Sequence, residues 1–151
     1  MKTRVLFVCI HNSARSQMAE AFLNHLAIDA FEAESAGLTP GKLNPNVVQV
    51  MNEIGIDISH NTTKDVFDFV KQGRRFHYVI TVCDEASAER CPVFVGVTQR
   101  LHWSFPDPSS FVGTHEEVLM MTRHVRDQIR EHLILWIETV RNTSLVQPTR
   151  R

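Results

Sequence analysis

The sequence predicts a single α/β domain with three layers, in which helices flank a central, mainly parallel four-stranded sheet. Its length of 151 residues suits one domain that buries its own core. Four strand-like runs alternate along the chain with stretches of helical periodicity, which is typical of parallel α/β folds. The first run, residues 5–8, is apolar without alternation, as expected for a strand buried on both faces of a parallel sheet.

The chain is expected to open with a strand, a loop and a helix. The apolar run of residues 5–8 gives way to polar residues, which predicts the end of the strand. A helical stretch begins at Ser16. In it, Met18, Phe22 and Leu26 lie four residues apart on one face, with no Pro or Gly between them. The polar loop therefore joins the carboxyl end of a buried strand to the amino end of a helix.

The next part of the chain predicts a strand at residues 31–36 and a helix at residues 45–54. The connection between them is rich in Gly, Pro and Asn. Hydroxyl and amide side chains at residues 59–63 are candidate caps for another helical stretch, which ends near Val70.

Residues 78–82 are a second fully apolar strand candidate, and this strand delivers Cys83 to its carboxyl end. Residues 93–97 predict a further strand. One long amphipathic helix follows, with apolar positions at Val118, Met121, Val125, Ile129, Leu133, Trp136 and Val140. The domain is expected to cover residues 1–142, and the polar residues 143–151 to form a disordered tail.

The composition excludes several classes of partner. The 16 basic and 17 acidic residues nearly balance, so no broad field favours nucleic acid or an anionic membrane surface. The first residues lack the apolar length and cleavage site of a signal peptide, and no window is long enough to span a bilayer. Three cysteines, an odd number, indicate thiols in a reducing compartment. We therefore expect a cytoplasmic protein without nucleic-acid or membrane partners.

The segment from Cys9 to Ser16, CIHNSARS, has the residue types of an oxyanion-binding loop with a nucleophile. A loop that enters a helix directs successive backbone N–H groups toward one point, where the helix dipole adds positive potential. Arg15 offers a planar fork for two oxygens, and Ser16 can donate a hydrogen bond that favours a Cys9 thiolate. The alternative is a buried cysteine followed by an unrelated arginine. The expected oxyanion-binding residues are Ile10, His11, Asn12, Ser13, Ala14 and Arg15.

Residues 5–20, VLFVCIHNSARSQMAE, resemble the active-site loop of the low-molecular-weight tyrosine phosphatase family, and within it the thioredoxin-coupled arsenate reductases. The resemblance implies the fold of that family, attack of Cys9 on an oxyanion and a thioredoxin-type reductant as partner. Because thiols supply the electrons, we expect no cofactor and no metal. Further landmarks follow in family order to about Val140, namely Ser35-Ala36-Gly37, residues 53–59, His102-Trp103 and Asp107-Pro108.

Residues 105–109, FPDPS, would by composition alone be interpreted as a turn. The resemblance instead implies that Asp107 is a general acid, which protonates the oxygen that leaves the central atom. Phosphatases of this family usually place aromatic residues after the Asp-Pro pair, whereas Ser109 and Ser110 follow it here. We therefore expect a small inorganic anion, arsenate or phosphate, rather than phosphotyrosine.

Cys83 and Cys91 are separated by a charged stretch of small residues that we expect to be mobile. From the residues alone they could be unrelated buried thiols, or a metal site with His77 or His102, although no regular ligand spacing supports zinc. The resemblance implies a relay: Cys9 attacks arsenate, Cys83 attacks Cys9 and releases arsenite, and Cys91 attacks Cys83. Thioredoxin then reduces the final disulfide.

Two positions differ from relatives in the family. His11 stands where phosphatases have Gly, and the loop can still close because His tolerates a positive φ. Some relatives hold a potassium ion beside the loop, at residues that match Asn12, Glu20, Ser35 and, in place of an acidic residue, Lys64. We expect the Lys64 ammonium to replace that ion, so potassium is not required.

Two other functions stay open at this point. A phosphatase acting on protein or small-molecule phosphates through a phosphocysteine needs only Cys9, Arg15 and Asp107, and would tolerate replacement of Cys83 and Cys91. A non-catalytic anion sensor would keep the loop and lack turnover. The combination of nucleophile, charge clamp and general acid disfavours the sensor.

Overall fold

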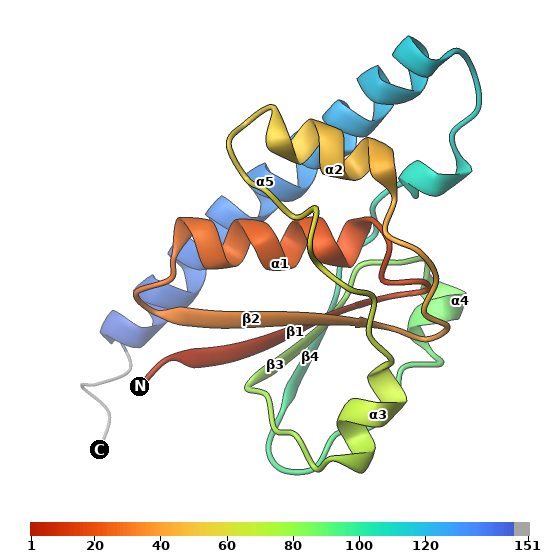
Figure 1. Ribbon diagram of the computed structural model, residues 1–151. Coiled ribbons are helices and arrows are strands. Elements are labelled where there is room, and N and C mark those ends of the chain that lie inside the picture. Colours follow the sequence, from red (N-terminus) through yellow and green to blue (C-terminus); the bar gives the residue numbers. More distant parts are fainter. Residues whose placement is uncertain (147–151) are drawn as a thin grey trace.

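The computed structural model describes residues 1–146, which form one domain on a four-stranded, all-parallel sheet (Figure 1). β1 is central and pairs with β2 and β3, while β4 lies at the edge beside β3. The predicted α/β fold is confirmed, and the sheet is wholly rather than mainly parallel. The strands are β1 (Thr3–Cys9), β2 (Phe31–Gly37), β3 (Tyr78–Thr81) and β4 (Gln99–His102), in the order β2-β1-β3-β4.

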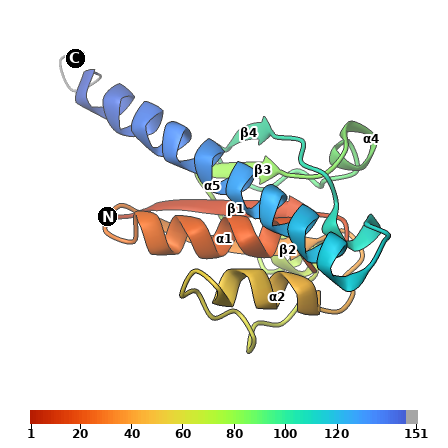
Figure 2. The ribbon, with the colours of Figure 1, turned by 90° about the horizontal axis from the view of Figure 1, so that it is seen from above.

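Helices cover both faces of the sheet. Three helices lie on one side, where α5 crosses α1 and also contacts α2, and α3 lies on the other side (Figures 1 and 2). This arrangement gives the three layers that the sequence predicts. The helices are α1 (Arg15–Leu26), α2 (Pro45–Asn52), α3 (Val66–Lys71), the single turn α4 (Glu85–Ala88) and α5 (His115–Val146).

Burial of β1 on both faces explains why its sequence shows no alternation. Val5, Phe7 and Cys9 belong to a core with α1 and α5, whereas Leu6 and Val8 belong to a second core with α3. All five side chains are at most 2% exposed. An inner parallel strand covered on both sides leaves no position for a solvated side chain. The strand therefore delivers Cys9 to the carboxyl edge of the sheet from a rigid centre.

The prediction of a strand at residues 93–97 is wrong. Phe94 is buried there, Val93 and Val97 are 78% and 101% exposed, and Gly96 has a φ of +88°. That φ interrupts the extended backbone, so the apolar run does not form a strand. β4 supplies the fourth strand instead, with residues that are exposed or half-buried. An edge strand tolerates such polar residues because one side of it faces solvent.

Residues 59–63 do not cap α3 as predicted. Asp65 is the cap, and its carboxylate accepts a hydrogen bond from Phe67 N at 2.8 Å. The residue before it is tied to the end of β2, because Gly37 N donates to Lys64 O at 2.8 Å. This extended segment runs beside the Cys9 loop.

Residues 143–146 do not belong to a tail as predicted, because α5 continues to Val146. No Pro or Gly interrupts the sequence of α5, and Thr143 Oγ1 donates to the Thr139 carbonyl at 2.9 Å within the helix. The remaining tail residues, 147–151, lie outside the described part of the chain. Within residues 1–146, no helix has the length and hydropathy needed to cross a membrane.

Candidate active site

Residues 10–14 form a tight loop between the end of β1 at Cys9 and the start of α1 at Arg15. Segment 38–44 donates N–H groups to four loop carbonyls at 2.8–3.1 Å, those of Cys9, Ile10, His11 and Ser13. The C=O of a trans peptide and the N–H of the next residue point in opposite directions. The N–H groups that follow these carbonyls therefore point into the loop, and Asn12 N donates to Cys9 Sγ at 3.2 Å. Converging N–H groups of this kind bind anions.

Asn12 makes the sharp turn in this loop. Its φ of +55° is the one positive value at a non-glycine position in the described residues, so the loop closes at Asn12 rather than at His11. Gly37 permits the close approach of β2 beneath the loop, since a Cβ there would lie 2.8 Å from Asn12 N and from Ile10 O. This close approach explains why the position of Gly37, one of the landmarks of the family resemblance, requires glycine.

Cys9 is buried, and its sulfur has hydrogen-bond partners on two sides. Ser16 Oγ lies 2.8 Å from Cys9 Sγ, and Asn12 N lies 3.2 Å from it. Asn12 Nδ2 donates to Ser16 Oγ at 2.7 Å, which uses a lone pair of the hydroxyl and leaves its single proton for the sulfur. Donors around a thiol favour its thiolate form. The arrangement suits a nucleophile at Cys9.

Arg15 is the first residue of α1 and is only 5% exposed. Its NH1 donates to the Phe105 carbonyl at 3.3 Å, and its NH2 lies 3.5 Å from Asp107 Oδ2. Its Nε is the one buried side-chain polar atom without a partner in residues 1–146. Leaving such a donor unpaired is costly, and a guanidinium matches two oxygens of a tetrahedral anion. An oxyanion beside Cys9 would satisfy it.

Asp107 lies beside the loop but comes from a segment that is distant in the sequence. It precedes a 3₁₀ turn, η1 (Pro108–Ser110), and caps it by accepting from Ser109 N at 3.0 Å. The turn suggested by composition is therefore present, and the same side chain also faces Arg15 at the rim of the loop. A carboxyl group at this place can exchange a proton with a departing oxygen.

Cys83 lies two residues beyond the end of β3 and belongs to the same core as Cys9. Burial raises the pKa of the Cys83 thiol to about 11, against a smaller opposing effect of the Arg15 guanidinium. The next residues do not extend as a loose link, because they form a helical turn, α4 (Glu85–Ala88). Asp84 caps this turn by accepting from Ser87 N at 2.7 Å.

Cys91 is not brought to the loop. It lies in the second core with Phe94, on the α3 side of the sheet, and burial raises the pKa of its thiol. All three cysteines are free thiols. The histidines considered as zinc partners are engaged elsewhere, since His77 Nδ1 accepts from Arg4 N at 2.9 Å and His102 Nδ1 lies 2.8 Å from Thr81 Oγ1. In the described part of the chain, no three His, Cys, Asp or Glu side chains are grouped as metal ligands.

Lys64 lies beside Glu20, one of the residues that the resemblance relates to a potassium site in some relatives. Its Nζ is 3.7 Å from Glu20 Oε1 and donates to Thr62 O at 3.2 Å, and Ser35 Oγ donates to Glu20 at 2.5 Å. Burial raises the pKa of Glu20, and the Lys64 ammonium acts in the opposite direction. A cation that belongs to the chain thus stands beside the loop.

We expect potassium to leave turnover unchanged. Replacing sodium by potassium at constant ionic strength should alter kcat by no more than about twofold, because the Lys64 ammonium already supplies the positive charge. The Lys64→Asp variant should gain a dependence on potassium. A large gain for the unaltered protein, measured by steady-state kinetics, would contradict this account.

Two polar residues, the buried Gln17 and the half-buried Asn61, were not singled out from the sequence. Gln17 and Asn61 are hydrogen-bonded to each other and, through Gln17, to Asn12. A glutamine in the first turn of a helix is an ordinary residue, and its partners lie up to 45 residues away in the chain. No local pattern therefore points to them.

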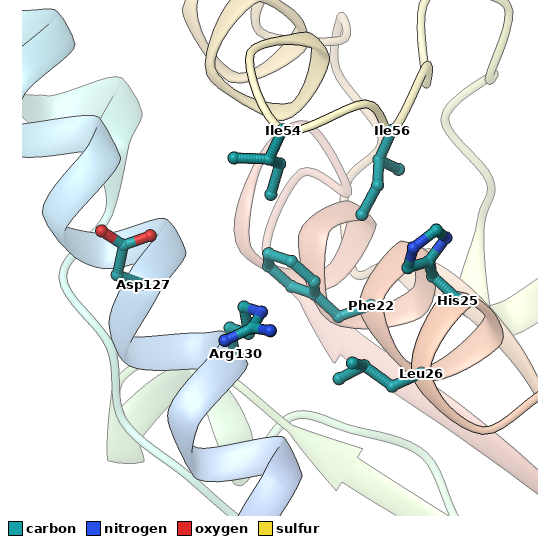
Figure 3. A pocket seen from close by; sticks show the side chains of 7 residues that line it. All are labelled: Phe22, His25, Leu26, Ile54, Ile56, Asp127 and Arg130. Atoms are coloured by element: carbon teal, nitrogen blue, oxygen red, sulfur yellow. The ribbon is translucent and has the colours of Figure 1, made fainter.

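A separate cavity of about 380 Å³ lies between α1, α5 and the residues that follow α2 (Figure 3). It opens beside the carboxyl half of α1, whereas the Cys9 loop lies at the amino end of that helix. None of the candidate site residues lines this cavity, so it is distinct from the Cys9 loop. Its lining is formed by Phe22, His25, Leu26, Ile54, Ile56, Asp127 and Arg130.

Several known proteins resemble this chain over most of its length. An arsenate reductase of Shouchella clausii is 41% identical over 139 residues, which cover 91% of this chain and 97% of that protein. A solved structure described as an arsenate reductase in the phosphate binding state has a TM-score of 0.70 at 34% identity, covering 92% and 98% of the two chains. A Corynebacterium glutamicum thioredoxin-dependent arsenate reductase has a TM-score of 0.63 at 31% identity, covering 91% and 61%.

The family comparison is equally extensive. Residues 4–145 match the description "Low molecular weight phosphotyrosine protein phosphatase", from β1 almost to the end of α5. The matched region contains the Cys9 loop, both further cysteines and Asp107. The solved relatives share the fold of this α/β domain with its four-stranded parallel sheet. By sequence and by fold, the chain belongs to the low-molecular-weight phosphotyrosine protein phosphatase family.

Proposed function

We propose that this protein reduces arsenate to arsenite with electrons from its own thiols. The observation that carries the proposal is the position of Cys83, in the same core as Cys9 and close enough to Arg15 for the guanidinium to act on its thiol. A phosphatase of this fold needs no second thiol there, whereas reduction of arsenate consumes two electrons, which two thiols can supply. The name of the Shouchella clausii relative supports the same substrate.

The first half of the reaction takes place at the loop. The Cys9 thiolate attacks arsenic and displaces an oxygen, which Asp107 protonates, so that a sulfur–arsenic bond forms and water leaves. The Cys83 thiolate then attacks Cys9 Sγ. The sulfur–arsenic bond breaks with its electron pair on arsenic, which passes from arsenic(V) to arsenic(III) and leaves as arsenite. The two thiols are oxidised to a Cys9–Cys83 disulfide.

The second half restores the nucleophile. Cys91 attacks Cys83, releases Cys9 as a thiolate and leaves a Cys83–Cys91 disulfide. For this step Cys91 must leave its core, where it is 5% exposed. The link between the two cysteines is α4, a single turn with no buried side chain, so unwinding it costs little packing energy. An external dithiol reduces the final disulfide, and a reducing cytoplasm suits the free thiols.

Arsenite release is expected to accelerate as the pH rises from about 7 to about 9. Burial holds the pKa of the attacking Cys83 thiol at about 11. Below that pKa, each pH unit increases the thiolate fraction about tenfold, so the rate of the exchange rises with it. The measurement is rapid-quench detection of arsenite from reduced protein without added thiol.

The same pH series has an internal control. Hydrolysis of an aryl phosphate at the Cys9 loop bypasses Cys83 and should not follow the rise. If arsenite release were constant over this pH range while the protein stayed folded, Cys83 would not be the attacking thiol.

A thioredoxin-type reductant is the proposed electron donor, and an apolar surface beside Cys91 supports this. Val93, Val95 and Val97 are exposed by 78%, 48% and 101%. Exposed apolar side chains that gather in one segment indicate an interaction surface. A reductant that reaches the Cys83–Cys91 disulfide would cover this segment, and the Corynebacterium glutamicum relative is named as thioredoxin-dependent.

Replacing Val93, Val95 and Val97 together by serine should raise the KM for thioredoxin about tenfold, since burying three exposed valines stabilises a complex by roughly 1–2 kcal/mol. Single-turnover arsenite release should be unchanged. The matched control is Leu135→Ser, which removes a side chain that is 63% exposed on α5, on the other side of the sheet. An unchanged KM in the triple variant would exclude this surface.

A further inference from the structure

Gln17 is a fully buried polar side chain that the proposed reaction does not use. It lies in the first turn of α1 and is 0% exposed. Its Nε2 contacts three oxygens, Asn12 O at 3.1 Å, Asn12 Oδ1 at 3.2 Å and Thr62 O at 3.0 Å. Its Oε1 accepts from Asn61 Nδ2 at 3.0 Å. With oxygens on one side and a donor on the other, only one orientation of the Gln17 amide satisfies all of its partners.

The orientation of the Asn12 amide follows from its own partners. Lys64 N, a backbone donor, lies 2.9 Å from Asn12 Oδ1, and Gln17 Nε2 donates to the same oxygen. The other side of the amide is therefore Nδ2, which donates to Ser16 Oγ at 2.7 Å. Ser16 has one proton left to donate, and Cys9 Sγ lies 2.8 Å from its oxygen. In each of these hydrogen bonds, the donor belongs to the residue farther from the sulfur.

We propose that Gln17 and Asn61 are positioning residues that orient the row Asn61→Gln17→Asn12→Ser16→Cys9, and that they thereby favour the Cys9 thiolate. The inference concerns the nucleophile alone. It requires only that Cys9 reacts as a thiolate, whichever oxyanion it attacks, so it can fail or succeed independently of arsenate reduction.

Burial makes this row effective. Asn12, Ser16 and Gln17 are each 0% exposed, so water does not compete for their hydrogen bonds. In such surroundings a hydrogen bond to a charged group is stronger than in water, and aligned bonds polarise one another. Without the Gln17 amide, Asn12 Oδ1 keeps only the Lys64 N–H, and the carbonyl of this left-handed residue loses its partner. One contact instead of two then orients the Asn12 amide, so its hydrogen bond holds Ser16 less firmly in the orientation that donates to the sulfur.

The test is the pH dependence of Cys9 alkylation by iodoacetamide, followed by peptide mapping so that only Cys9 is counted. Gln17→Met keeps the length of the side chain and removes its donors and acceptor. Asn61→Ala removes the outermost donor at a half-buried position, which puts less of the fold at risk. Gln49→Met is the control, at an exposed position on α2. Thermal unfolding of each variant shows whether it is folded.

The expected result is a higher midpoint of the alkylation profile in Gln17→Met, with alkylation at a pH below the midpoint about tenfold slower and the plateau at high pH unchanged. Asn61→Ala should shift the midpoint in the same direction by a smaller amount, about threefold in rate, and the control should not shift it. If Gln17→Met is unfolded, Asn61→Ala decides. Unchanged midpoints in the folded variants would overturn the proposal, and so would a change confined to the plateau.

Discussion

Arg15→Lys is expected to lower kcat/KM for arsenate about 10³-fold, which corresponds to ~4 kcal/mol of transition-state stabilisation. Lysine keeps the positive charge and loses the planar fork. The unpaired Nε of Arg15, buried beside the Cys9 loop, is the group that an oxyanion would satisfy together with a terminal N–H. A single ammonium cannot bind two oxygens in this way, nor hold both the Phe105 carbonyl and Asp107.

Steady-state kinetics and phosphate binding together check this prediction. Both the affinity for phosphate and kcat should fall, because the guanidinium faces the anion in the ground state and in the transition state. Arg130→Lys on α5 is the matched control, since Arg130 lines the separate cavity of Figure 3. A loss of less than about tenfold in Arg15→Lys would mean that the backbone N–H groups alone hold the anion.

Cys83→Ser should lower the rate of arsenite release at least about 10³-fold. It should leave the rate of aryl phosphate hydrolysis within about twofold of that of the unaltered protein. A serine hydroxyl cannot form a disulfide with Cys9, so the electrons do not reach arsenic. The loop itself is unaltered, and Cys9, Arg15 and Asp107 still serve attack on a phosphate ester.

Burial of the new hydroxyl is the main risk in that experiment. Cys83 is 0% exposed, and an unpaired hydroxyl there costs roughly 1–3 kcal/mol of stability. Cys83→Ala removes the sulfur without adding a polar group and keeps the test valid if the serine variant is unstable. Arsenite release by either folded variant would exclude Cys83 from the reduction.

The fold could be predicted where burial controls the sequence. The uninterrupted apolar run of β1 and the periodic stripe of α5 both reflect packing, and both elements were found as predicted. β4 could not be found because an edge strand exposed to solvent carries no apolar pattern. Residues 93–97 have the apolar composition of a strand but do not pair with the sheet. The end of α5 was placed too early because the sequence from residue 143 onward is mostly polar, as in a tail.

Some residues of the candidate site could likewise be predicted from the sequence, and others could not. Cys9, Arg15 and Ser16 stand together in the chain, so their loop could be predicted from a strand, a polar segment and a helix. Asp107 and Cys83 reach that loop only through the fold, and the resemblance to a family was needed to name them. The Gln17 network left no signal, because its hydrogen bonds join segments that are far apart in sequence.

The measurement that tests the central claim most directly is a single turnover of fully reduced Cys91→Ser protein with arsenate, without added thiol. The account predicts one arsenite per chain and a Cys9–Cys83 disulfide in the peptide map, because the relay stops before its second exchange. If no arsenite appears and both cysteines stay reduced, while the same protein hydrolyses an aryl phosphate, the chain is a phosphatase and not a reductase.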